Sequence, residues 1–123
     1  MATAEHLQAI SILNEKMQNT SDTEAALSFF ELDMQFHSSI VQASANIPLI
    51  ETHRQYNRRL FRARFVSSRI RLKRTQTLAQ HQRITDALLA RNAEATAYEL
   101  RGHLHSAVEN IKLAFEADQT NDT

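Results

Sequence analysis

Residues 29–41 have the sequence FFELDMQFHSSIV, and the spacing of the apolar side chains predicts an α-helix with one buried face. On a helical wheel of about 100° per residue, Asp33 points in nearly the same direction as Ile40 and within about 60° of Phe36. His37 projects the same way one turn later. Burying an ionised carboxylate among phenylalanines costs several kcal/mol unless a cation or a set of donors meets it. The stretch therefore predicts both a helix and a polar partner for Asp33.

The composition of the whole chain favours an all-α fold. Its 123 residues include one Gly, one Pro and no Cys, which leaves little turn chemistry for a hairpin-rich sheet. We expect an antiparallel helical bundle of about five helices, forming one domain over residues 1–117 with a frayed polar tail over residues 118–123. The lack of cysteine excludes thiolate metal sites and disulfides, so any metal must be held by histidine and carboxylate. No apolar run is long enough to span a membrane and no secretion signal is visible, so we expect a cytoplasmic protein with no membrane partner.

Polar clusters set the expected limits of the first helices. The first helix carries the apolar stripe of residues 7–17 and ends at the polar residues 19–22. Ser21 or Asp22 is expected to cap the second helix, which continues to about residue 45.

The remaining helices begin at similar signals. Asn46 is expected to cap a third helix, whose first turn tolerates Pro48. Thr75 or Thr77 is expected to open a fourth helix, and a short break at Arg91-Asn92 precedes the fifth. Residues expected on the inner faces of the third, fourth and fifth helices are Leu49, Ile50, Tyr56, Leu60, Phe61, Phe65, Leu78, Ile84, Leu88, Leu89, Leu100, Leu104, Ala107, Val108, Ile111 and Phe115.

Two further histidines fall on apolar faces of their helices. His81 points with Ile84 and Leu88, and His103 lies at one edge of the stripe of the fifth helix, beside small residues. A single buried histidine is usually a hydrogen-bonded core residue, and Asp33 with His37 alone could be a neutralised pair. Four such residues together offer nitrogen and oxygen ligands suited to Zn²⁺, Ni²⁺, Mn²⁺ or Fe²⁺ with open coordination positions.

Four short motifs resemble those of a known family. They are Leu32-Asp33-Met34-Gln35-Phe36-His37, Ala43-Ser44-Ala45-Asn46, Gln80-His81-Gln82-Arg83-Ile84-Thr85-Asp86-Ala87-Leu88 and Arg101-Gly102-His103-Leu104. The chain resembles, from about Thr3 to Ala114, the FCD domain, which is the effector-binding domain of the FadR subfamily of GntR transcription regulators. The resemblance assigns the metal-ligand role to Asp33, His37, His81 and His103.

The resemblance also implies a ligand and partners. An FCD domain is expected to hold a divalent metal, zinc first among the candidates, on which a small organic acid docks, and to form a homodimer. An arginine of the third helix commonly assists the carboxylate. Arg59 matches that family position, whereas the helical wheel places Arg64 nearer the interior together with His53 and Asn57.

The chain departs from the family pattern in two ways. The winged helix-turn-helix domain and the first helix of the effector domain are missing, so we expect a fragment that reaches DNA only through that missing domain. The turn before the last helix has Arg91-Asn92 where the family usually has Gly-Asp, and Asn92 is expected to tolerate the left-handed conformation of a helix end.

Two other classes of function remain as alternatives to a binding module. A metal with open positions could activate water in a hydrolase, for which Glu99 is the candidate base, although we expect no enzyme and assign no catalytic residue. Nine of the fourteen basic residues lie between Arg54 and Arg74, with aromatic residues among them, which is a pattern of nucleic-acid binding. The formal net charge of zero argues against such binding through overall charge.

Overall fold

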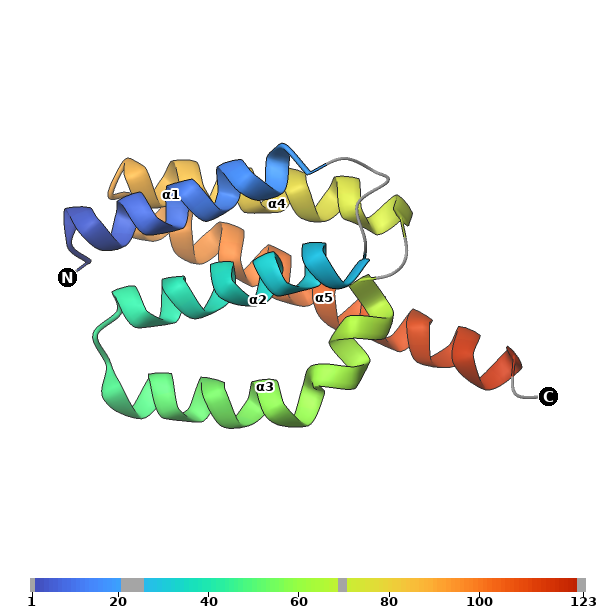
Figure 1. The fold of residues 1–123 in the computed structure, drawn as a ribbon. Coiled ribbons are helices and arrows are strands. Elements are labelled where there is room, and N and C mark those ends of the chain that lie inside the picture. Colours follow the sequence, from blue (N-terminus) through green and yellow to red (C-terminus); the bar gives the residue numbers. More distant parts are fainter. Residues whose placement is uncertain (1, 21–25, 69–70, 122–123) are drawn as a thin grey trace. The chain divides into compact units, whose positions relative to one another are not determined.

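The computed structural model describes residues 2–20, 26–68 and 71–121, and it is all-α over these ranges (Figure 1). Its five helices are α1 (Ala4–Gln18), α2 (Ala26–Ala43), α3 (Ile47–Ser68), α4 (Arg71–Leu89) and α5 (Ala93–Asn121). The predicted fold class and number of helices are confirmed. By internal contacts the chain forms two compact units, residues 1–60 and 61–123, so that the boundary falls inside α3. The single domain over residues 1–117 stays a prediction.

The first unit is built on an antiparallel pair of helices, α1 and α2, which pack side by side (Figure 1). A capping box begins α1, in which the Thr3 hydroxyl accepts from the His6 backbone N–H and the His6 ring accepts from the Thr3 N–H. His6 is partly exposed. The expected caps Ser21 and Asp22 of the second helix lie outside the described residues. The buried apolar residues of the pair are Leu7, Ile10, Met17, Phe29, Phe30, Phe36 and Ala43.

A tight connection joins α2 to α3. The Asn46 side chain accepts from the Leu49 backbone N–H at 3.1 Å, which confirms the predicted cap. Pro48 lies in the first turn, as expected. Ala45, just before the cap, has a φ of 55°, which is the left-handed region that an L-residue with a Cβ adopts only at a cost.

We expect Ala45→Gly to stabilise the protein by about 1 kcal/mol, because glycine adopts the left-handed conformation without the Cβ clash. Ala45 is exposed, so the substitution removes no packing. The matched control is Ala9→Gly, at an exposed position inside α1, where the same chemical change should destabilise by about 1 kcal/mol. Urea denaturation of both variants measures the two opposite effects, and equal effects on the midpoint would contradict the explanation.

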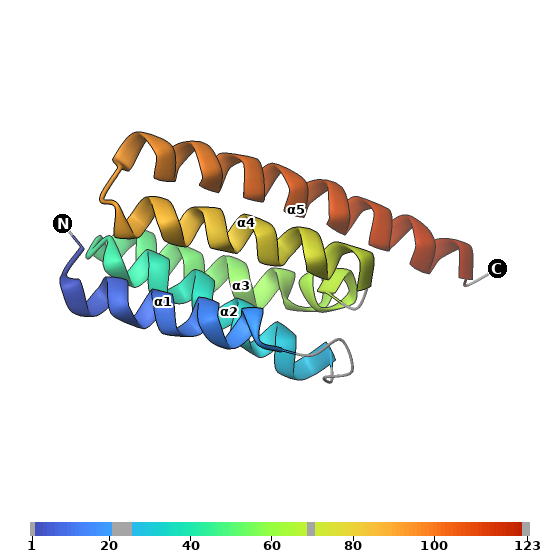
Figure 2. The ribbon, with the colours of Figure 1, turned by 90° about the horizontal axis from the view of Figure 1, so that it is seen from above.

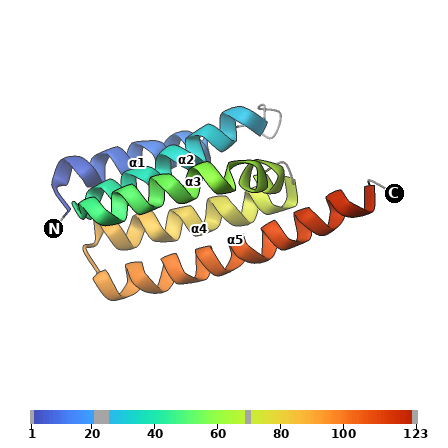
Figure 3. The ribbon, with the colours of Figure 1, turned by 90° about the horizontal axis from the view of Figure 1, so that it is seen from below.

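The second unit is built on another antiparallel pair, α4 and α5, which lie side by side in both rotated views (Figures 2 and 3). The prediction that Thr75 or Thr77 opens the fourth helix was wrong, since α4 already begins at Arg71. Residues 71–74 read RLKR, and all three residue types favour helix, so the helix extends ahead of the threonines.

The turn between α4 and α5 falls at Arg91-Asn92 as predicted, but Asn92 is not the residue with the left-handed conformation. Arg91 has the left-handed φ, at 52°. Asn92 instead caps α5, and its side chain accepts from the Ala95 backbone N–H at 3.0 Å. At its other end α5 continues to Asn121, so the segment expected as a frayed tail is helical over residues 118–121. Polar residues without Gly or Pro do not by themselves end a helix.

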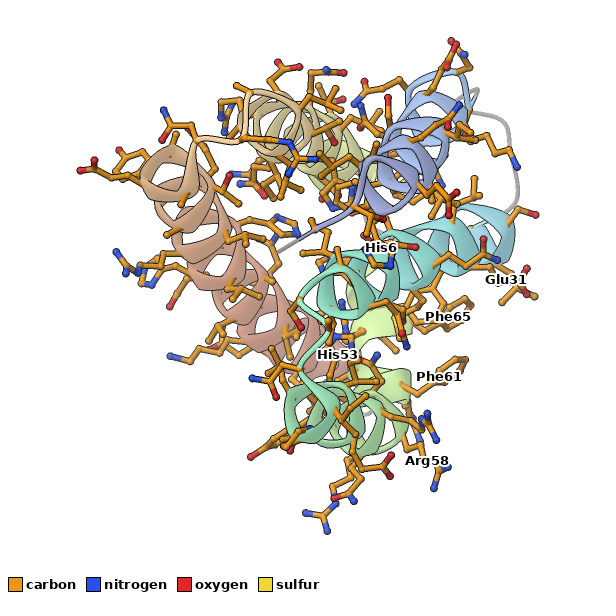
Figure 4. All side chains as sticks on the ribbon, turned by 90° about the vertical axis from the view of Figure 1, so that its left-hand side faces the viewer. His6, Glu31, His53, Arg58, Phe61 and Phe65 are labelled. Atoms are coloured by element: carbon orange, nitrogen blue, oxygen red, sulfur yellow. The ribbon has the colours of Figure 1, made fainter. Side chains whose placement is uncertain are left out.

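Several apolar residues expected on inner faces are exposed. On α3 these include Tyr56 and Phe61, which are 59% and 51% exposed, and on α5 they include Leu104 and Val108. In Figure 4 the Phe61 side chain extends away from its helix. The wheel identifies an apolar stripe but does not tell whether a neighbouring element covers it. No helix among the described residues is both long and apolar enough to cross a membrane.

Candidate metal centre

The first pair of predicted ligands lies on one helix of the first unit. Asp33 and His37 are one turn apart on α2, and His37 Nε2 lies 3.1 Å from Asp33 Oδ1. The two side chains are 16% and 11% exposed, so the pair is largely shielded from water. The edge of the Phe36 ring packs beside the His37 imidazole, with ring centroids 5.9 Å apart. The carboxylate that the sequence marked as anomalous thus has its polar partner on the same helix.

The second pair connects the two helices of the second unit. His81 of α4 and His103 of α5 are 0% and 5% exposed, and their Nε2 atoms face each other at 3.2 Å. The rings meet edge to face, with centroids 4.8 Å apart. The prediction that His81 points inward is confirmed, and His103 is also buried.

The spacing of both pairs fits two ligands of one metal ion. Two ligand atoms bound at about 2.0–2.1 Å are about 3.3 Å apart in a tetrahedral site and about 3.0 Å apart in an octahedral one. The observed separations, 3.2 Å between the imidazole nitrogens and 3.1 Å between His37 and Asp33, fall between these values. The donor set is nitrogen and oxygen throughout, as borderline divalent metals prefer. Each half of the predicted site therefore has a geometry that suits an ion.

The surroundings of the histidine pair contain residues that the sequence did not reveal. Gln80 is buried, and its Oε1 lies 2.6 Å from His103 Nδ1, while its Nε2 donates to Ser106 Oγ at 3.1 Å. Thr85 is also buried and donates to the His81 backbone carbonyl at 2.8 Å. In the sequence, the only hint of this role is that Gln80 is a polar residue next to His81, which was expected to be buried. Helical periodicity alone does not predict which residues of α5 the Gln80 side chain contacts.

The residues predicted to bind the organic acid differ in their exposure to solvent. On α3, the Asn57 amide lies 3.4 Å from His53 Nδ1, and both residues are partly buried. Arg59 is exposed, whereas Arg64 is half-buried. Figure 4 marks His53 on the same helix as Arg58, whose side chain extends outward.

Comparison with known proteins identifies the family. A family model described as the FCD domain matches residues 1–106, which is most of the chain. The chain belongs to the FCD domain family. This domain is the ligand-sensing domain of GntR-family transcription regulators. A search of curated proteins found no match, and a search of solved structures found none either.

Membership in the FCD family bears on the two alternative functions. The family is regulatory, which implies a binding role rather than catalysis. In this FCD domain the Glu99 carboxylate, considered above as a base, accepts from Arg83 Nε at 3.1 Å in an ion pair between α5 and α4. Within the basic segment, Arg54 pairs with Glu51 at the surface, while Arg74 is buried. Both observations fit structural roles for these side chains.

Proposed function

We propose that this FCD domain senses a small carboxylic acid at a divalent metal ion held by Asp33, His37, His81 and His103, and that occupancy is transmitted to a winged helix-turn-helix domain. Zinc is the first candidate for the ion, and nickel, manganese and iron suit the same ligands. The domain acts as a binding module, and no residue is assigned a catalytic role.

The single observation that carries the proposal is the buried histidine pair. Two imidazoles whose Nε2 atoms meet at 3.2 Å, with almost no contact with water, would supply two of the four proposed ligands. The Asp33–His37 pair would complete the set and add a negative charge that partly neutralises the ion. A divalent ion shared by both pairs also supplies the cation that the largely buried Asp33 carboxylate favours.

The chemistry of such a site favours a carboxylate ligand. Coordination positions left open by the protein would accept one carboxylate oxygen and a neighbouring hydroxyl. A guanidinium could hold the second oxygen in a bidentate contact. Arg64 is the better candidate than Arg59, because its half-buried position weakens screening by water.

Elemental analysis of the purified protein, with native mass spectrometry for a retained acid, tests the proposal directly. We expect about one divalent ion per chain, and we expect small hydroxy acids to raise the melting temperature only when the ion is present. Arg64→Gln should abolish most of this acid-dependent rise, because it removes the bidentate contact, while Arg59→Gln serves as the exposed control.

Two results would count against this function. Protein that takes up no divalent ion would remove its basis. An acid response that persists after metal removal would show that the acid binds elsewhere in the domain.

We propose in addition that the domain forms a homodimer. Supporting this are the apolar residues Leu104, Val108 and Phe115, which share one face of α5 and are each about half exposed. Sedimentation velocity over a range of concentrations measures the association, and a monomer at high concentration would contradict it.

A further inference from the structure

The contacts behind His103 point to a role for Gln80, one that rests on the proposed metal site. We infer that Gln80 is a positioning residue, which fixes the tautomer and orientation of His103 so that the Nε2 lone pair is available to a metal ion. The contacts involved all join α4 and α5 within the second unit.

The tautomer follows from the chemistry of the amide oxygen. Gln80 Oε1 lies 2.6 Å from His103 Nδ1, and a carbonyl oxygen can only accept a hydrogen bond. The proton of a neutral His103 ring must therefore be on Nδ1. Its Nε2 then carries a lone pair, directed toward His81 Nε2 at 3.2 Å.

Ser106 contacts the other end of the Gln80 amide. The Gln80 Nε2 group donates to Ser106 Oγ at 3.1 Å, one turn of α5 beyond His103. In this orientation the amide oxygen faces Nδ1, whereas an NH₂ group in its place would favour the opposite tautomer. The two hydrogen bonds connect Ser106 through Gln80 to His103 Nδ1. The lone pair is on the other ring nitrogen of His103, Nε2.

Burial strengthens these two hydrogen bonds of Gln80. Gln80 is 8% exposed and His103 is 5% exposed, so water competes little for either contact. Hydrogen bonds that orient a ligating histidine are generally worth about 10- to 100-fold in metal affinity. Gln80 touches neither the proposed ion nor its acid ligand, so it would act entirely through His103.

The test combines NMR with metal titration at constant pH. In the metal-free protein, two-bond ¹H–¹⁵N spectra of the imidazole nitrogens should show His103 with its proton on Nδ1. In Gln80→Leu that preference should disappear, and the Kd for Zn²⁺, measured by competition with a chromophoric chelator, should rise about 10- to 100-fold. Gln76→Leu makes the same change at an exposed position of α4 and should leave both readouts unchanged.

Two further variants separate positioning from simple packing. Gln80→Glu keeps an acceptor facing Nδ1, so it should restore both the tautomer and the Kd to within a few-fold of the wild type. Ser106→Ala leaves Gln80 in place but releases its amide, and it should weaken Zn²⁺ binding by several-fold. If Gln80→Leu fails to fold, these two variants still decide the question.

Different failures are distinguishable. A wild-type Kd and an Nδ1–H tautomer in Gln80→Leu would overturn the role of Gln80 while leaving the metal site standing. The same holds if Gln80→Glu binds as weakly as Gln80→Leu. Wild-type protein that binds no Zn²⁺ would overturn the proposed function and this inference with it.

Discussion

Replacing His103 with alanine is expected to weaken divalent-metal binding by more than about 100-fold. Structural zinc sites of zinc-finger peptides, which have four protein ligands, have apparent binding free energies of about 10–16 kcal/mol, so the loss of one of four ligands should remove a large share of such a binding free energy. His103 is 5% exposed and its Nε2 faces that of His81, so the substitution removes one of the two buried imidazoles. His81→Ala should have a comparable effect, since it removes the other nitrogen of the pair.

His105→Ala provides the matched control, because His105 lies on the same helix two residues away and is exposed. It should leave the Kd unchanged. His6 is a poorer control, since its ring takes part in the capping box of α1. The measurement is a chelator competition with Zn²⁺ or Co²⁺, and equal Kd values for His103→Ala and His105→Ala would refute the ligand assignment.

The fold was predictable where local rules act alone. The apolar period in residues 29–41 predicted a helix, and the Asn46 side chain caps α3 as expected from its residue type. Errors arose where two local signals competed. Threonine favours a helix start, but the helix-forming residues before Thr75 extended α4 to Arg71. The same rules could not predict that Tyr56 and Phe61 are exposed, because an apolar helix face does not specify which element covers it.

The candidate site was predictable in its residue types and only partly in its contacts. Asp33 and His37 are one turn apart, so their proximity follows from helix geometry. His81 and His103 are on different helices, and only the way α4 packs on α5 brings their Nε2 atoms together. Gln80 illustrates the limit, since its two partners, His103 and Ser106, are both on the opposing helix.

Removal of the metal is expected to lower the free energy of unfolding by about 4 kcal/mol. The reference is protein in a solution whose free ion concentration is about 1,000 times the Kd. For a chain of this size, such a change corresponds to a fall in melting temperature of at least about 10 °C. Circular dichroism of protein with Zn²⁺ and with excess chelator measures the difference. The His103→Ala variant should melt at nearly the same temperature in both solutions, because it has lost the ion in either case.

Hydrogen exchange distinguishes one shared ion from two separate polar pairs. In one case the ion binds Asp33 and His37 as well as the histidine pair. Its removal should then speed amide exchange both in α2 and in α4 and α5, because each pair loses its bonds to the ion. If the ion is held by the histidine pair alone, exchange should increase in the second unit while α2 keeps its protection. Asp33→Asn sharpens the comparison, since it retains a side chain of nearly the same size but removes the negative charge. A melting temperature unaffected by chelator, with loss of the ion verified, would instead mean that hydrogen bonds alone hold these four side chains.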